Sequence, residues 1–159
     1  MSATSCTNSN PLRYIFALLT VLIWAGTAEA QGPGIRGGVS IDPDQGYFGA
    51  HYETGALVDR LHFRPNIEAG LGDDLTTISL NFEFAYKFPT RNRWQLYAGA
   101  GPAVNFYNRD TGGDDDDTET DAGLNFLFGV EQRSGLFFEF KLGVIDSPEV
   151  KFGVGYTFR

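Results

Sequence analysis

Serine and histidine are the side chains of this chain that could support nucleophilic catalysis, provided that one of each came together. After residue 30 the histidines are His51 and His62, and the serines are Ser40, Ser79, Ser134 and Ser147. A nucleophile and its base must lie within hydrogen-bond reach, yet no His-x-Ser motif occurs in this stretch. Both histidines fall where an expected strand faces the interior of the fold, and there we predict packed, hydrogen-bonded side chains. The sequence therefore predicts no enzyme activity.

A dense group of carboxylates is the second feature with chemical potential. The segment from Asn108 to Asp121 contains seven acids and one base. We predict a mobile, solvated loop, because the segment has too few apolar residues to order itself by burial. A sharper hypothesis is that Asp114, Asp115, Asp116 and Asp117 gather divalent cations through their oxygen atoms. No glycine-spaced calcium loop supports it, so such binding would be weak and sensitive to salt.

Other kinds of site find little support in the sequence. Gly99-Ala100-Gly101 and Gly112-Gly113 do not lie between a strand and a helix, as a phosphate-binding loop requires. The net charge of -8 disfavours nucleic-acid binding, which depends on clustered basic residues. The single cysteine, Cys6, cannot form an internal disulfide, and no zinc-type spacing of Cys and His occurs. We therefore expect no cofactor.

The elements that must position these residues are strands. From Ile35 to Phe158, apolar and polar residues alternate over runs that Asp, Gly, Pro, Arg or Asn interrupt, a pattern typical of strands. The runs predict eight strands, at 34–41, 46–54, 61–71, 75–88, 94–107, 122–131, 136–144 and 149–158. Successive side chains of a strand point to opposite faces, so each run presents one apolar and one polar face. The chain is thus expected to be all-β, folded as an eight-stranded antiparallel up-and-down barrel.

The polar face of these strands predicts a filled and charge-balanced interior. Five bases (Arg36, Arg64, Lys87, Lys141 and Lys151) accompany five acids (Glu53, Glu68, Glu83, Glu131 and Glu139). Buried charges need partners, because an unpaired one costs several kcal/mol. If Asp73-Asp74 is a two-residue hairpin tip, Arg64 lies opposite Glu83, and we predict that these two pair in the lumen. An eight-stranded barrel is filled by side chains, so broad solute conduction is not expected.

The N-terminus has the pattern of a secretory signal peptide over residues 1–30. Arg13 gives positive charge, Tyr14 to Ala25 form an apolar stretch, and Ala28-Glu29-Ala30 offers a small-x-small cleavage site. The mature barrel domain would then span residues 31–159. The alternative is a membrane anchor, but the apolar stretch is shorter than the roughly 20 residues that span a bilayer.

The loops between the strands separate by charge into two ends of the barrel. One end collects Asp42, Asp44, Asp73, Asp74, Asp110, Asp114 to Asp117, Glu119, Asp121 and Asp146, and the other collects Arg60, Arg91, Arg93, Arg133 and Arg159. The acidic end has the one long connection. Bacterial barrels have long external loops and short periplasmic turns, so the acidic loops are expected outside and the termini in the periplasm.

These features resemble the small eight-stranded outer-membrane barrel family, which includes the barrel domain of outer-membrane protein A and outer-membrane protein X. The likeness covers the mature chain and includes a last strand ending Phe152-Gly153-Val154-Gly155-Tyr156-Thr157-Phe158, followed by Arg159. It implies a place in the Gram-negative outer membrane. The implied partners are membrane lipid, lipopolysaccharide and the barrel assembly machinery, and the implied role is non-enzymatic, in envelope structure or surface interaction through acidic loops.

Two alternatives remain open. One is a lipid-modifying outer-membrane enzyme without a recognisable motif, since some members of the family modify lipid A. The other is a soluble, lipocalin-like ligand-binding barrel, in which the apolar face would line the cavity. Bulky Phe and Leu on all strands would overfill such a cavity, and no disulfide pair is available.

Overall fold

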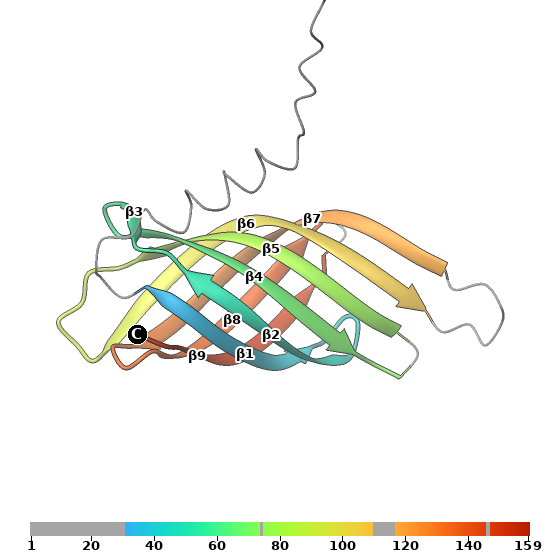
Figure 1. Cartoon of the computed structure of the whole chain (residues 1–159), viewed down its shortest axis with the longest axis horizontal. Helices are drawn as coiled ribbons and strands as arrows, with labels where there is room; N and C mark the ends of the chain where they lie inside the picture. Colours follow the sequence, from blue (N-terminus) through green and yellow to red (C-terminus); the bar gives the residue numbers. More distant parts are fainter. Residues whose placement is uncertain (1–30, 74, 110–116, 146) are drawn as a thin grey trace, which may run out of the picture.

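The computed structural model describes residues 31–73, 75–109, 117–145 and 147–159, and these form an all-β fold (Figure 1). The predicted signal peptide, residues 1–30, lies outside the described residues. The strands are β1 (Gly32–Ser40), β2 (Gln45–Glu53), β3 (Ala56–Val58), β4 (Leu61–Leu71), β5 (Leu75–Lys87), β6 (Trp94–Arg109), β7 (Asp117–Gln132), β8 (Leu136–Val144) and β9 (Val150–Thr157).

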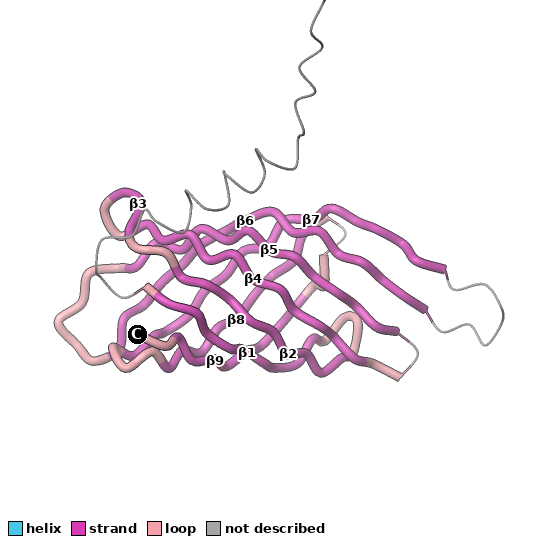
Figure 2. Tube along the Cα trace, viewed as in Figure 1, coloured by secondary structure: helices cyan, strands magenta, loops and turns pink. Residues whose placement is uncertain are grey.

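The strands close into an antiparallel barrel (Figure 2). Their hydrogen-bonded order is β2-β1-β9-β8-β7-β6-β5-β4-β3, and an additional pairing of β2 with β4 closes the ring. β3 has three residues and pairs only at the end of β4, so it stands apart from the eight strands of the wall. The predicted eight-stranded up-and-down barrel is therefore confirmed, with β3 as an addition.

A tight turn joins β7 and β8 at the end where the C-terminus lies. Between β7 and β8 the chain reverses through Gly135, whose φ is 105° and whose N–H donates to the Gln132 carbonyl at 2.8 Å. Such a φ is easily adopted only by glycine, which has no Cβ. At the opposite end, the Gly72 amide donates to the Leu75 carbonyl at 3.0 Å, as expected for the predicted two-residue tip.

The sequence-based boundaries are wrong at the long acidic connection. β6 continues to Arg109 and β7 begins at Asp117, and the two pair without interruption from Trp94↔Gln132 to Arg109↔Asp117. The residues at both ends of the predicted mobile loop therefore belong to a hairpin. Backbone hydrogen bonds to the neighbouring strand order these residues. The prediction of a mobile loop considered only the burial of apolar side chains and did not include this pairing.

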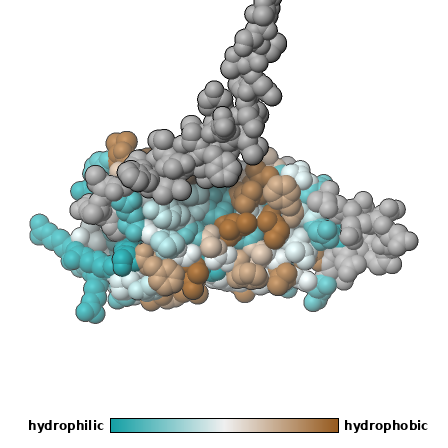
Figure 3. Space-filling model, viewed as in Figure 1, coloured by the Kyte–Doolittle hydropathy of each residue, from teal (hydrophilic) through white to brown (hydrophobic). Residues whose placement is uncertain are grey.

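The two faces of the wall are assigned as the sequence predicts. Polar residues are buried inside, and large apolar residues are exposed outside, among them Phe48, Leu96, Phe126, Phe128, Phe138 and Phe152. Figure 3 shows hydrophobic residues along the barrel wall and hydrophilic ones at its ends. A lipocalin-like barrel needs the reverse arrangement, so that alternative is wrong. In the part of the chain that the structure describes, no helix is long and apolar enough to cross a membrane.

Candidate functional site: the charge network that fills the lumen

The interior of the barrel is occupied by ionised side chains from nearly every strand. All five bases and all five acids that the sequence places on the inner face are buried, with residue exposures from 0% to 7%. Strict alternation along each strand brings them together, because every second side chain of a wall strand points inward. The predicted polar, charge-balanced lumen is confirmed.

The middle of the lumen contains a cluster of two bases and three acids. The Arg36 guanidinium lies 3.1 Å from Glu68, 3.5 Å from Glu83 and 3.2 Å from Glu139. Lys141 lies 2.7 Å from Glu68 and 2.5 Å from Glu83. Lys141 also lies 3.7 Å from Glu139, so each of the three carboxylates is shared by Arg36 and Lys141, and residues from β1, β4, β5 and β8 are linked across the barrel.

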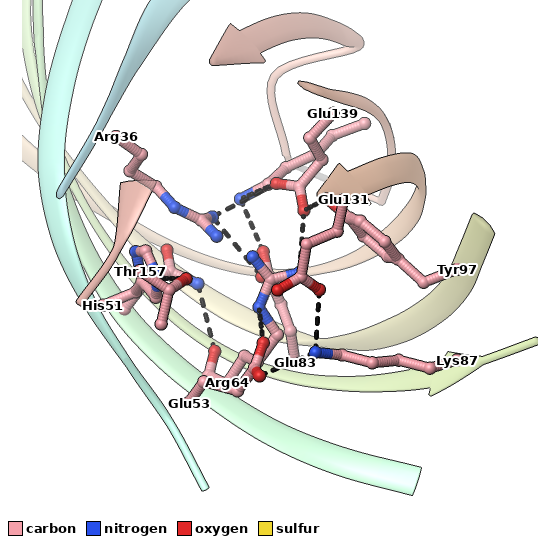
Figure 4. Close-up of polar contacts among 12 residues, drawn as sticks. Arg36, His51, Glu53, Arg64, Glu83, Lys87, Tyr97, Glu131, Glu139 and Thr157 are labelled. Carbon is pink, nitrogen blue, oxygen red and sulfur yellow. Dashed lines mark hydrogen bonds and ion pairs between the residues drawn. The ribbon is translucent and has the colours of Figure 1, made fainter. Parts of the chain in front are cut away.

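Arg64 and Glu83 do not form the predicted ion pair, although they occupy the predicted register. They lie opposite each other in β4 and β5, and both are 0% exposed. Among the described residues, the ion pairs of Arg64 are with Glu139 at 3.3 Å and with Glu53 at 3.6 Å (Figure 4). The reason is geometric: inside the lumen, the Arg64 side chain meets Glu53 from the neighbouring strand β2 and Glu139 from β8 across the barrel.

A second cluster lies at the end of the lumen where the C-terminus is found. The Lys87 ammonium is 2.7 Å from both Glu53 and Glu131. Arg159, at the end of the chain, pairs with the same two carboxylates. Since Glu53 also contacts Arg64, this cluster is continuous with the central one.

Aromatic side chains inside the lumen escaped the sequence analysis. Tyr97 and Phe137 are 2% and 1% exposed, and the Arg64 guanidinium lies 4.9 Å and 4.8 Å from the centres of their rings. The Tyr97 hydroxyl donates to Glu139 at 2.8 Å. Their signal was available in the sequence, because each occupies an inward position of its strand, between outward neighbours such as Leu96 and Phe138. Ring faces attract cations, so these residues support Arg64 from the sides that carboxylates do not reach.

Neutral side chains form further hydrogen bonds in the lumen. The Asn125 amide donates to Asn81 at 2.8 Å, and Asn81 donates to Asn66 at 2.7 Å. Ser79 donates to Asn105 at 2.7 Å. Together with the two charged clusters, these neutral side chains fill the lumen.

The candidate catalytic side chains are used in this packing. His51 bonds Thr157 through Nε2 and Oγ1 at 2.9 Å, and His62 bonds the Thr54 carbonyl at 3.0 Å. Ser79 and Ser147 bond Asn105, Ser134 bonds Gln132, and in the described ranges no serine hydroxyl bonds a histidine. Among the described residues, no serine hydroxyl therefore lies within hydrogen-bond reach of a histidine base.

The proposed divalent-cation residues fall largely beyond what the structure describes. Asp114, Asp115 and Asp116 lie outside the described residues, and for Asp117 only the backbone is described, at the start of β7. Elsewhere in the described ranges, no group of three or more His, Cys, Asp or Glu side chains is arranged to hold a metal ion. The cation hypothesis remains a prediction.

Comparison with known proteins identifies the fold. No protein-family model matches the sequence, and no curated protein matches it either. Among solved structures, the barrel is similar to the crystal structure of Neisserial surface protein A, with a TM-score of 0.56 and 21% sequence identity. The match covers 80% of this chain and 95% of that chain. At this identity the likeness shows a shared barrel fold.

Proposed function

We propose that this chain is a small integral barrel of the Gram-negative outer membrane. Its function would be non-enzymatic, in envelope structure or in surface contacts made through the acid-rich end. The observation that carries the proposal is the inverted distribution of polarity: ionised residues are buried, whereas large apolar residues are exposed around the wall. Such a surface is costly in water and favourable in a bilayer.

A barrel is the form in which strands can cross a bilayer. Lipid offers no hydrogen-bond partners, so backbone groups must be satisfied within the wall, and ring closure removes the open edges. The pairing of β2 with β4 provides that closure here. Aromatic residues such as Trp94, Tyr86 and Tyr156 are exposed on the wall, consistent with the aromatic girdles of membrane barrels.

The filled lumen favours a structural or surface role over transport. The charged clusters and the amides between their residues are buried and hydrogen-bonded or ion-paired. A solute crossing the barrel would have to break several buried ion pairs, each of which leaves uncompensated charges. Solute conduction is therefore not part of the proposed function.

The proposed orientation follows from the ends of the barrel. The β6–β7 hairpin and the turns with Asp42 and Asp73 share one end, and the basic turns share the other with the C-terminus (Figure 1). We assign the acidic end to the outside and the termini to the periplasm. The partners of this arrangement would be membrane lipid, lipopolysaccharide and the barrel assembly machinery.

Cell fractionation combined with a heat-modifiability gel tests the proposal. We expect the chain in the outer-membrane fraction, migrating differently before and after boiling, because a closed barrel resists unfolding in detergent. A soluble periplasmic chain without a band shift would contradict it. The composition of lipid A is compared in cells with and without the gene. If it differs, and if one substitution in the barrel abolishes the difference, the chain is instead an enzyme.

A further inference from the structure

A proline interrupts the ladder between β2 and β4 near the end of β2. The paired residues run from Gly46↔Leu71 to His51↔Asn66, and the next position would pair Tyr52 with Pro65. Beyond it, the Thr54 amide donates to the Phe63 carbonyl at 3.0 Å, so the same register continues. The interruption is therefore local to Pro65.

The register identifies the backbone group that loses its partner. In an antiparallel ladder, every second pair exchanges both N–H···O=C bonds. Since Thr54 bonds Phe63 across this seam, the pair two residues along, Tyr52 and Pro65, is also of the bonded type. Proline has no N–H. The carbonyl of Tyr52 consequently lacks the donor that any other residue at position 65 would supply.

A shallow groove lies on the outer surface at Pro65, the residue opposite Tyr52 in the register. It has a volume of about 290 Å³, and Ala50, Pro65, Ile67, Leu80 and Phe82 line it on the outward side. Ala50 and Pro65 are short side chains between longer ones, which explains the hollow. The lining is hydrocarbon, whereas the neighbouring Tyr52 carbonyl is a hydrogen-bond acceptor.

We propose that this groove binds a membrane-lipid acyl chain that carries a hydroxyl group, with the hydroxyl donating to the Tyr52 carbonyl. An unsatisfied carbonyl is costly in a bilayer, where water cannot reach it. An apolar chain suits the groove, and a hydroxyl on that chain supplies the donor that Pro65 lacks. The inference rests on the proposed membrane location and adds a lipid class to it.

Native mass spectrometry of the refolded barrel tests this occupant. The protein is mixed with equal amounts of two lysophospholipids that carry a tetradecanoyl or a 3-hydroxytetradecanoyl chain. We expect the hydroxylated lipid to be retained about fivefold better, the effect of one net hydrogen bond. Pro65→Val restores the N–H and should bring the ratio to about one. Ala50→Phe should fill the groove and release both lipids.

Pro102→Val is the matched control. The Phe88 amide donates to the Leu96 carbonyl across β5 and β6, so by the same alternation Phe82 and Pro102 form a pair of the bonded type. Because proline has no N–H, the Phe82 carbonyl lacks this donor. That carbonyl points toward β6, away from the groove. This variant should keep the wild-type preference. Equal retention by the wild type, or loss of preference in Pro102→Val, would overturn the proposal. A dimer of the wild-type chain that dissociates in the Ala50→Phe variant would also overturn the proposal, because a second copy of the chain would then occupy the groove.

Insertion into lipid vesicles is measured on the same preparations. A chain that inserts but shows no preference contradicts this inference alone. A chain that folds in micelles yet fails to insert into vesicles contradicts the proposed function, and this inference with it.

Discussion

Arg64 and Glu83 lie directly opposite each other on β4 and β5, yet their charges are neutralised by residues of other strands. Arg64 meets Glu139 of β8 and Glu53 of β2, and Glu83 meets Arg36 of β1 and Lys141 of β8. Cross-strand neighbours inside a narrow barrel are thus not necessarily ion partners. The shared carboxylates link the walls of the barrel instead.

This exchange of partners predicts the outcome of charge reversal. Arg64→Glu should destabilise the folded barrel by about 3–5 kcal/mol, because it leaves uncompensated buried charge. Glu83→Arg should not rescue it. In a double-mutant cycle, Arg64→Met and Glu139→Gln should couple by roughly 1–3 kcal/mol, and Arg64→Met and Glu83→Gln by less. Urea unfolding in detergent micelles gives these values, and full rescue by Glu83→Arg would show that the opposite pair is the functional one.

The outward face makes a separate prediction about stability in a bilayer. Phe126 lies on β7 and is 40% exposed. Phe126→Arg should destabilise the barrel by roughly 2–4 kcal/mol if the residue lies near the bilayer midplane, where an arginine is least favourable. Phe126→Leu is the control and should cost much less. Unfolding titrations in lipid vesicles measure both, and an arginine variant as stable as the leucine variant would argue against membrane exposure of this face.

The proposed orientation predicts which loops antibodies reach. An epitope tag between Gly112 and Asp114 should be labelled on intact cells, because it extends the connection between β6 and β7 at the acidic end. A tag in the turn at Thr90 to Arg93 should be labelled only after permeabilisation. Labelling with the opposite selectivity would reverse the assignment of the two ends.

The cation hypothesis predicts a weak calcium signal at the acidic hairpin. Calorimetry should detect calcium binding to the refolded barrel, and replacing Asp114 to Asp117 by Asn should abolish it, since uncharged amides are poorer ligands for a hard cation. Binding should weaken as salt increases, because exposed charges are screened. Equal heats from both proteins would eliminate the cation role.

The sequence alone determined the architecture and the two faces of the wall. Alternation of period two assigns each residue to one face, so Phe126 could be placed outside and Arg64 inside without coordinates. The Asp73-Asp74 tip then fixed the register that places Arg64 opposite Glu83. These are local properties, since a turn and a strand period constrain only the chain next to them.

Tertiary structure alone decided which charges meet across the lumen. Glu139, the partner of Arg64 on β8, is 75 residues away in the chain and lies across the ring, so its distance from Arg64 depends on barrel closure and stagger. The aromatic rings of Tyr97 and Phe137 beside Arg64, and the groove next to Pro65, likewise require the strands to be assembled. The continuation of β6 and β7 into the acidic segment was also hidden from composition, because pairing between two strands, and not burial, orders those residues.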